Sequence, residues 1–146
     1  MVVLFGLLFG AVFEILSTNR IAWDIGSTTQ ILENQARFGL NNMARELYNT
    51  NSGRIAITGA APNQAVTFQV PVSYDINGNL RWGADIEGNF IRYSINGNQL
   101  LRQVLDSNQQ PLVPPNQRIL ANDVGGGGLQ FTLNNNLLTI TLTTQR

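Results

Sequence analysis

The first fifty residues constrain the fold more than any other segment, because they have the pattern of one long helix. From Met1 to Leu16 the apolar residues point in every helical direction, and Glu14 is the single charge. From Ile21 onward the apolar residues follow one stripe at steps of three or four. Such a helix would be about 75 Å long, more than a 146-residue globule covers. We therefore expect half of it to contact something other than its own domain.

The two halves of the predicted helix have different expected environments. Residues 1–20 form an apolar half, which we expect to be surrounded by membrane lipid or by other apolar helices. Its members are Val2, Val3, Leu4, Phe5, Gly6, Leu7, Leu8, Phe9, Gly10, Val12, Phe13, Ile15 and Leu16. Residues 21–50 form an amphipathic half, which we expect to pack against a sheet through Ile21, Ile25, Leu32, Leu40, Met43 and Leu47. Residues 51–146 are predicted to form an antiparallel β domain, so the expected fold class is α+β.

The apolar half is short for a membrane span. The 13 residues before Glu14 cover about 20 Å, whereas the hydrocarbon core is about 30 Å thick. About six more apolar residues before Met1 would complete a span, and we expect them to be missing. A cleaved secretory signal is an alternative, although no basic residue precedes the run and no small-residue cleavage site follows it. A second alternative is a helix buried inside a soluble protein, although the rest of the chain is too small to enclose such a helix easily.

The helix also resembles a known family. The run VVLFGLLFGAVFEIL and the segment STNRIAWDIGSTTQILENQARFGLNNMAREL after it are similar to the N-terminal helix of type IV pilin-like proteins, particularly minor pilins and type II secretion pseudopilins. Residues 33–47 are the most specific part. The basic leader, cleavage glycine and early glutamate of that family do not precede the run here. We therefore expect a precursor that starts upstream of Met1.

A second segment, IRYSINGNQLLRQVL at residues 91–105, resembles the sheet of the same family. The resemblance implies a filament subunit that is held in the bacterial inner membrane, with its β domain outside the cytoplasm, and that later enters a periplasmic or surface filament. The implied partners are other pilin-like subunits, an inner-membrane assembly platform, a prepilin peptidase acting on the precursor, and membrane lipid. Pilus, secretion pseudopilus and competence filament are not distinguished.

After the helix, the apolar pattern changes to the two-residue period of strands. Alternating segments predict strands at residues 54–58, 65–73, 74–76, 80–82, 89–95, 99–105, 117–120, 129–133 and 138–142. Asn-Gly-Asn turns at residues 77–79 and 96–98 predict hairpins. Residues 106–116 are predicted to form a proline-rich loop, and the glycine run at 125–128 a flexible turn.

The composition argues against catalysis and against nucleic-acid binding. The chain has no His and no Cys, so the usual general base, the thiolate and the commonest metal ligand are absent from it. Nine basic and nine acidic residues cancel, and no basic patch is formed. The glycine run lacks the lysine and the following helix of a phosphate-binding loop. We expect no enzyme, no cofactor and no nucleic-acid partner.

Carboxylates are the remaining candidates for chemistry. Asp85 and Glu87 are two residues apart, and Asp75 is nearby in sequence. We interpret them as solvated loop acids. A calcium-stabilised loop, which some pseudopilins possess, and a catalytic pair are the alternatives.

Two functions of other classes stay open. One is a membrane-anchored extracytoplasmic binding domain unrelated to filaments, and the other is a coiled-coil oligomer built on the amphipathic stripe. A basic leader, a glycine and an aromatic-and-glutamate start upstream of Met1 would separate a filament subunit from the binding domain. A coiled coil predicts a stable dimer or trimer after removal of residues 1–20.

Overall fold

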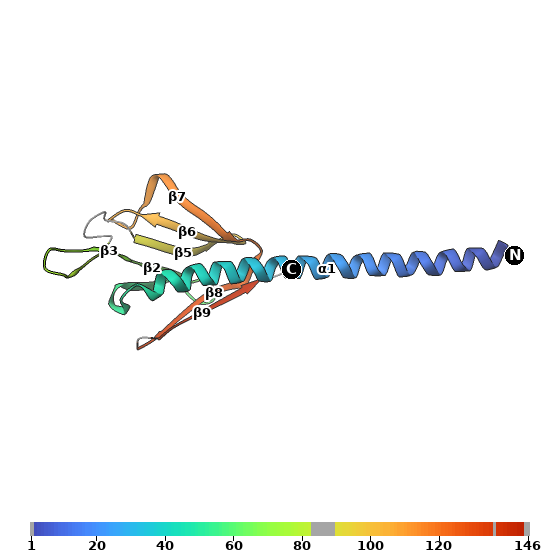
Figure 1. Cartoon of the computed structure of the whole chain (residues 1–146), viewed down its shortest axis with the longest axis horizontal. Coiled ribbons are helices and arrows are strands. Elements are labelled where there is room, and N and C mark those ends of the chain that lie inside the picture. The colour runs from blue at the N-terminus through green and yellow to red at the C-terminus, as the bar shows by residue number, and fades with distance from the viewer. Residues whose placement is uncertain (1, 83–89, 136, 145–146) are drawn as a thin grey trace.

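A single helix, α1 (Val2–Tyr48), carries the rest of the chain around its C-terminal end (Figure 1). The computed structural model describes residues 2–82, 90–135 and 137–144. The helix has 47 residues and is therefore about 70 Å long. It passes without a break from the apolar to the amphipathic half, which confirms the prediction of one continuous helix.

The chain leaves α1 through a short capped turn. The N–H groups of Asn49 and Thr50 still donate to helix carbonyls, and a 3-10 helix, η1 (Ser52–Arg54), follows. The Asn51 side chain caps η1 by accepting a hydrogen bond of 2.9 Å from the N–H of Gly53. The helix thus ends at Tyr48, but residues 49–53 contain no left-handed residue, so the asparagine- and glycine-rich sequence ends it through this turn and not through a left-handed cap.

Five antiparallel strands form the main sheet, in the order β1-β2-β5-β6-β7. They are β1 (Ile55–Thr58), β2 (Ala65–Phe68), β5 (Phe90–Asn96), β6 (Gln99–Leu105) and β7 (Pro111–Ala121). Two separate antiparallel pairs are β3 (Pro71–Tyr74) with β4 (Leu80–Trp82), and β8 (Val124–Asn134) with β9 (Leu137–Thr144). The described residues thus have an α+β fold with mostly antiparallel strands, as expected.

The hairpins predicted from Asn-Gly-Asn turns are present. β5 and β6 close at the pair Asn96 and Gln99, and Gly97 has a φ of 59°. That left-handed conformation favours glycine, which explains why the turn sequence was informative. The terminal hairpin of β8 and β9 is also present, with Phe131 opposite Ile140.

Two segments that were predicted to be irregular are strands. Residues 111–116 belong to β7, where the prolines are tolerated because β7 is the last strand of the sheet and one of its edges needs no donors. The glycine run belongs to β8. A Cβ atom on Gly128 would lie 2.5 Å from side-chain atoms of Ile95 and Val124. Close packing, and not a flexible turn, therefore explains a glycine there.

The strand predicted at residues 65–73 is divided in two. β2 ends at Phe68, β3 starts at Pro71, and Val72 is exposed, so Val72 does not share the buried face. Between them, the carbonyl of Gln69 accepts a hydrogen bond from the Thr50 hydroxyl. These contacts and the missing N–H of Pro71 direct β3 away from the main sheet and into a separate ribbon.

The hydrophobic core lies where α1, the main sheet and β8 meet. Its buried members are Met43, Leu47, Val66, Phe68, Ile91, Tyr93, Leu100, Leu120, Ala121, Val124, Leu129 and Phe131. Only the last turns of α1 contribute to it. The core therefore fixes the rear of the helix to the β domain and leaves the front without such contacts.

Gly39 allows α1 to approach the sheet closely. Its Cβ position would lie 2.8 Å from Leu100 Cδ2 and 3.8 Å from Leu120 Cβ, whereas Gly26 in the same helix has no such atom within 4 Å. Of Gly26 and Gly39, Gly39 is thus the one required by packing.

Replacing Gly39 with leucine is expected to lower the free energy of unfolding by about 1–3 kcal/mol, because the added atoms must displace Leu100 or the helix. Gly26→Leu is the matched control, and it should raise stability by up to about 1 kcal/mol through helix propensity. Chemical denaturation of both variants measures the difference. Equal changes in stability for the two variants would contradict a role for Gly39 in the close approach of α1 to Leu100.

Candidate assembly surface

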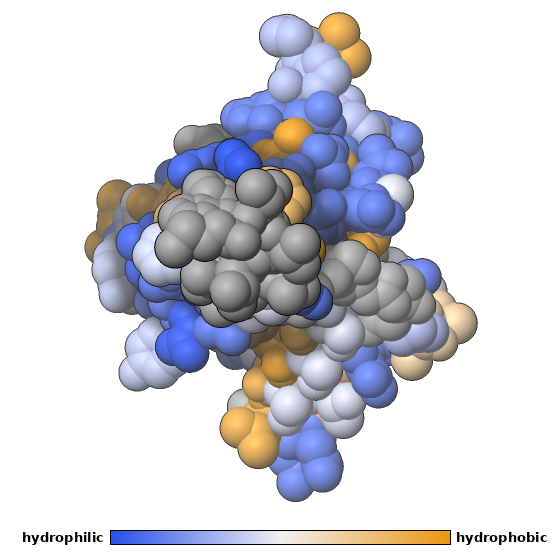
Figure 2. All heavy atoms as spheres, turned by 90° about the vertical axis from the view of Figure 1, so that its right-hand side faces the viewer, coloured by the Kyte–Doolittle hydropathy of each residue, from blue (hydrophilic) through white to orange (hydrophobic). Residues whose placement is uncertain are grey.

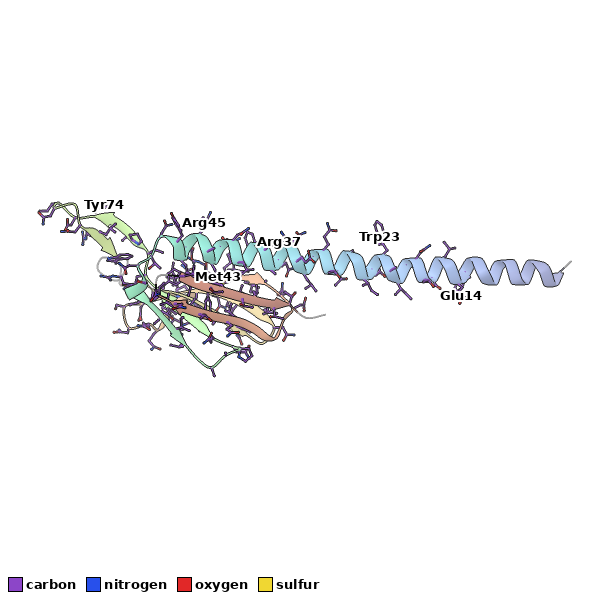
Figure 3. The ribbon with its side chains drawn as sticks, turned by 90° about the horizontal axis from the view of Figure 1, so that it is seen from below. Glu14, Trp23, Arg37, Met43, Arg45 and Tyr74 are labelled. Carbon is purple, nitrogen blue, oxygen red and sulfur yellow. The ribbon has the colours of Figure 1, made fainter. Side chains whose placement is uncertain are left out.

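The amphipathic stripe packs on the β domain over its second half. Leu32, Met43 and Leu47 are buried, and Leu40 is partly buried against the core cluster. Met43 and Leu47 belong to the core cluster together with residues of the main sheet and β8, and Leu40 packs against it, whereas Leu32 is buried without being a member of that cluster. Met43 points from α1 into the β domain (Figure 3).

The first part of the stripe does not pack on the β domain. Ile21 and Ile25 are 60% and 46% exposed, so the prediction that they contact the sheet is wrong. The physical reason is length, since partly buried side chains begin only at Thr29 and α1 extends far beyond the β domain (Figure 1). The amphipathic pattern continues past the end of the surface that the chain itself provides.

We call residues 13–28 of α1 the free segment. Every side chain that the structure describes in this range is exposed. The large apolar ones are Phe13, Leu16, Ile21, Trp23 and Ile25. Trp23 is 79% exposed and points away from the side of the helix that carries the β domain (Figure 3). The free segment therefore presents apolar side chains to solvent on more than one side.

Residues 2–20 of the predicted apolar half lie in α1. The side chains of residues 2–12 and of Ile15 are outside the described part, while Phe13 and Leu16 are exposed. Among the described residues, no helix offers the length of apolar sequence that a membrane crossing needs.

The β-domain surface around the rod is mixed in character. Figure 2 looks along α1 from its N-terminal end and shows mainly hydrophilic residues on the visible parts of the β domain, with smaller apolar areas between them. The β domain also exposes large apolar side chains, among them Tyr74, Ile76 and Val113, so residues 13–28 are distinguished by having no buried side chain among those described and not by apolar exposure alone.

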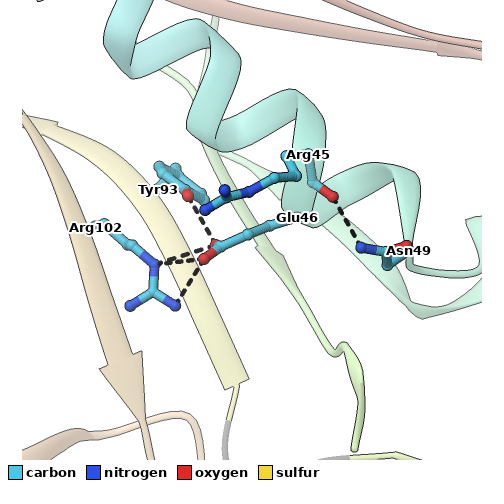
Figure 4. Close-up of polar contacts among 5 residues, drawn as sticks. All are labelled: Arg45, Glu46, Asn49, Tyr93 and Arg102. Carbon is cyan, nitrogen blue, oxygen red and sulfur yellow. Dashed lines mark hydrogen bonds and ion pairs between the residues drawn. The ribbon is translucent and has the colours of Figure 1, made fainter.

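A polar cluster at the rear of α1 holds the helix to the sheet (Figure 4). Glu46 accepts a hydrogen bond of 2.7 Å from the Tyr93 hydroxyl and one of 3.0 Å from Arg102 Nε, and its Oε1 lies 2.9 Å from Arg102 Nη2. Both charged side chains are about three-quarters buried. This cluster was not predicted, because its members are far apart in sequence.

Burial and the contacts with Glu46 shift the pKa values of Arg102 and Tyr93. Burial lowers the pKa of Arg102, but the hydrogen bond and charge of Glu46 outweigh this, so the pKa is raised overall. Burial, and then the hydrogen bond and charge of Glu46, raise the pKa of Tyr93 above 10.0. The raised pKa values keep the Arg102 guanidinium charged and the Tyr93 phenol neutral.

Glu46→Ala is expected to lower the free energy of unfolding by about 2 kcal/mol, because it leaves the Tyr93 hydroxyl and the Arg102 guanidinium without their acceptor. Glu33→Ala removes the same side chain from an exposed position on the same helix and should change stability by less than about 0.5 kcal/mol. Urea denaturation gives both values. A loss of equal size in the two variants would contradict a role for the cluster.

The raised pKa of Tyr93 also predicts a pH dependence. A proton held more tightly in the folded state stabilises the protein fully below pH 10, and this contribution is lost as the pH rises toward the folded-state pKa. Denaturation at pH 9 and at pH 11, compared with Tyr93→Phe, should show a smaller alkaline loss in the variant. The same loss in both proteins would assign the dependence to other groups.

The candidate acidic residues do not form a site in the described part of the chain. Asp85 and Glu87 lie outside the described residues. The Asp75 carboxylate accepts hydrogen bonds from the side chain and backbone of Asn79 and from the N–H of Asn77, which lower its pKa. It thus stabilises its own turn. Among the described residues, no group of acidic side chains is arranged to hold a metal ion.

No protein-family model, curated protein or solved structure matches the chain. Inference about function therefore depends on the residues and their arrangement. That arrangement joins two parts with different tasks: a β domain fixed to the rear of a helix by core packing and by the Glu46 cluster, and a free segment that exposes apolar side chains.

Proposed function

We propose that the chain is a structural subunit, a minor pilin or pseudopilin, of a type IV pilus-like or type II secretion filament. In this proposal the front of α1 holds the subunit in the bacterial inner membrane and then packs against the helices of neighbouring subunits. The single observation that carries the proposal is the free segment, an apolar-bearing length of about 24 Å that its own domain does not cover.

The energetic argument concerns the exposed apolar side chains. Fully burying a side chain such as leucine, isoleucine or phenylalanine is worth about 1.5–3 kcal/mol. The free segment carries five large apolar side chains that are each nearly half or more exposed. Neighbouring helices would bury these side chains, and in lipid or in a filament core α1 would remain a helix because its backbone hydrogen bonds are internal.

The attachment of the β domain supports the same function. A subunit of a helical filament must transmit force between its helix and its outer domain. The buried residues Met43 and Leu47, the close approach at Gly39 and the ion pair of Glu46 with Arg102 fix the two parts together. A rod attached this firmly places the β domain at a defined position relative to the helices that α1 packs against.

Cell fractionation of the producing bacterium tests the proposal. An antibody against the β domain should find the chain in the inner membrane and, after mechanical shearing, in the filament fraction. Inactivating the assembly ATPase should leave the membrane pool and empty the filament fraction. An unchanged distribution, with the chain in the membrane alone in both strains, would contradict the proposal and favour a membrane-anchored binding domain.

A further inference from the structure

β1 is a short edge strand of the main sheet. It pairs with β2 on one side only, and the described residues supply no strand on the other side. Its four residues, Ile-Ala-Ile-Thr, include no proline and no charge. The opposite edge of the sheet, β7, contains Pro114 and Pro115 and a register shift, which are features that block pairing. Of these two edges, β1 is the one open to another strand.

The backbone groups of β1 that point outward can be assigned. The N–H of Ile55 donates to the carbonyl of Ser52, so it does not pair with β2. Because the pattern of an antiparallel ladder repeats every two residues, Ile57 directs its N–H and carbonyl to the same free edge. An added strand would find its first backbone partners there.

Two pockets flank β1, one on each of its faces. The inner pocket, of about 380 Å³, lies toward the end of α1 and is lined by Leu47, Ile55, Leu133, Leu138 and Ile140, among others. The outer pocket, of about 460 Å³, is lined by Arg54, Ala56, Thr67, Gln69, Phe90 and Gln109, among others. Both pockets have mixed linings: the inner pocket has apolar strand residues beside Tyr48, Thr50 and Ser52, and the outer pocket has polar residues and the cation of Arg54 beside Ala56 and Phe90.

The cation of the outer pocket is held in place. The Arg54 guanidinium donates to Gln69 Oε1 at 2.6 Å and lies 4.7 Å from the centre of the Trp82 ring. Gln69 and Thr67 at the base of the pocket are almost fully buried. On the same face, Arg92 donates to the Thr67 hydroxyl at 3.2 Å. This arrangement favours a negatively charged group in the outer pocket.

We propose that β1 is a docking site for an extended peptide segment of a partner protein, which adds as a strand to its free edge. Successive side chains of a strand point to opposite faces. The partner strand would therefore place apolar side chains in the inner pocket and carboxylates in the outer pocket. Backbone pairing supplies affinity, and the two pockets supply the choice of sequence. The inference is independent of the filament proposal, because it concerns residues far from the free segment.

Peptide binding to the purified full chain in a nonionic detergent tests the inference. The probe is a fluorescein-labelled peptide of sequence SEVEIEVES, in which apolar residues alternate with glutamates. We expect it to bind with Kd below about 1 mM, at least about tenfold more tightly than the lysine peptide SKVKIKVKS. SEVEIEVES with an N-methylated isoleucine keeps every side chain but lacks one backbone N–H directed at β1, and it should also lose at least about tenfold. No binding, or equal binding of the three peptides, would overturn the proposal.

Reversing the charge of Arg54 tests whether the peptide binds beside β1. Arg54→Glu should reverse the preference, so that the lysine peptide binds more tightly than the glutamate peptide. Arg118→Glu makes the same charge change on β7, at the opposite edge of the sheet, and should leave the preference unchanged. Circular dichroism confirms that both variants are folded. A reversal by Arg118→Glu and not by Arg54→Glu would place binding elsewhere.

Amide hydrogen exchange tests the backbone pairing directly. Bound SEVEIEVES should slow exchange of the Ile57 amide at least about tenfold. Protection confined to residues 137–144 of β9, with Ile57 unchanged, would contradict docking at β1.

Discussion

Replacing Met43 with alanine is expected to lower the free energy of unfolding by about 2–5 kcal/mol. Met43 is fully buried and belongs to the core cluster formed by α1, the main sheet and β8. Truncation removes its contacts and leaves a cavity at the junction between helix and β domain. Because this junction attaches α1 to the sheet, we expect the largest loss of stability among our variants here. Chemical denaturation followed by circular dichroism gives the value.

Ile21→Ala is the control for this measurement. It shortens an apolar side chain on the same helix at a position that is 60% exposed, and it should change stability by less than about 0.5 kcal/mol. If Ile21→Ala were as costly as Met43→Ala, the front of α1 would be packed within the folded subunit. That result would contradict the division of α1 into an anchored and a free part.

Ile25→Asp is expected to reduce the amount of the chain in the sheared filament fraction at least about tenfold while leaving its thermal unfolding unchanged. Ile25 lies on the free segment and is half exposed. In the isolated subunit, solvent therefore accommodates the new carboxylate at little cost. Between packed apolar helices, a carboxylate loses its hydration, which costs several kcal/mol. Quantitative immunoblotting of the fractions measures the effect.

Asn41→Asp is the matched control for Ile25→Asp. It adds the same charge to an exposed position of α1, but on the part of the helix that carries the β domain. We expect the filament fraction to keep at least about half of its content. If both variants were lost equally, added charge on any part of the helix would be sufficient, and the free segment would have no special role.

The sequence predicted the helix and its rear contacts well, because both depend on a local period. Leu32, Met43 and Leu47 are buried where the stripe indicated. The same stripe was misleading at Ile21 and Ile25. An amphipathic pattern shows that a face needs a partner, but it does not identify whether the partner lies in the same chain.

The predictions that failed in the β domain share a physical cause. Prolines in residues 111–116 and the glycine run of β8 have low intrinsic strand propensity. Their places at the edge of a sheet and in a crowded contact override that preference. The Glu46 cluster was missed for a different reason, since Tyr93 and Arg102 are 47 and 56 residues away from Glu46. No short-range pattern joins them.

In the proposed filament, the free segment of α1 is the surface through which this chain joins neighbouring helices. Photo-crosslinking in the producing bacterium tests it most directly. A benzoylphenylalanine replaces Trp23 in one variant and Tyr48 in the other, both of which are highly exposed on the same helix. Mass spectrometry then identifies the crosslinked peptides.

We predict that the probe at Trp23 crosslinks to the apolar N-terminal helix of another pilin-like subunit or of a second copy of this chain. The probe at Tyr48 should give no crosslink to such a helix. Crosslinks to N-terminal helices from position 48 and none from position 23 would contradict the claim.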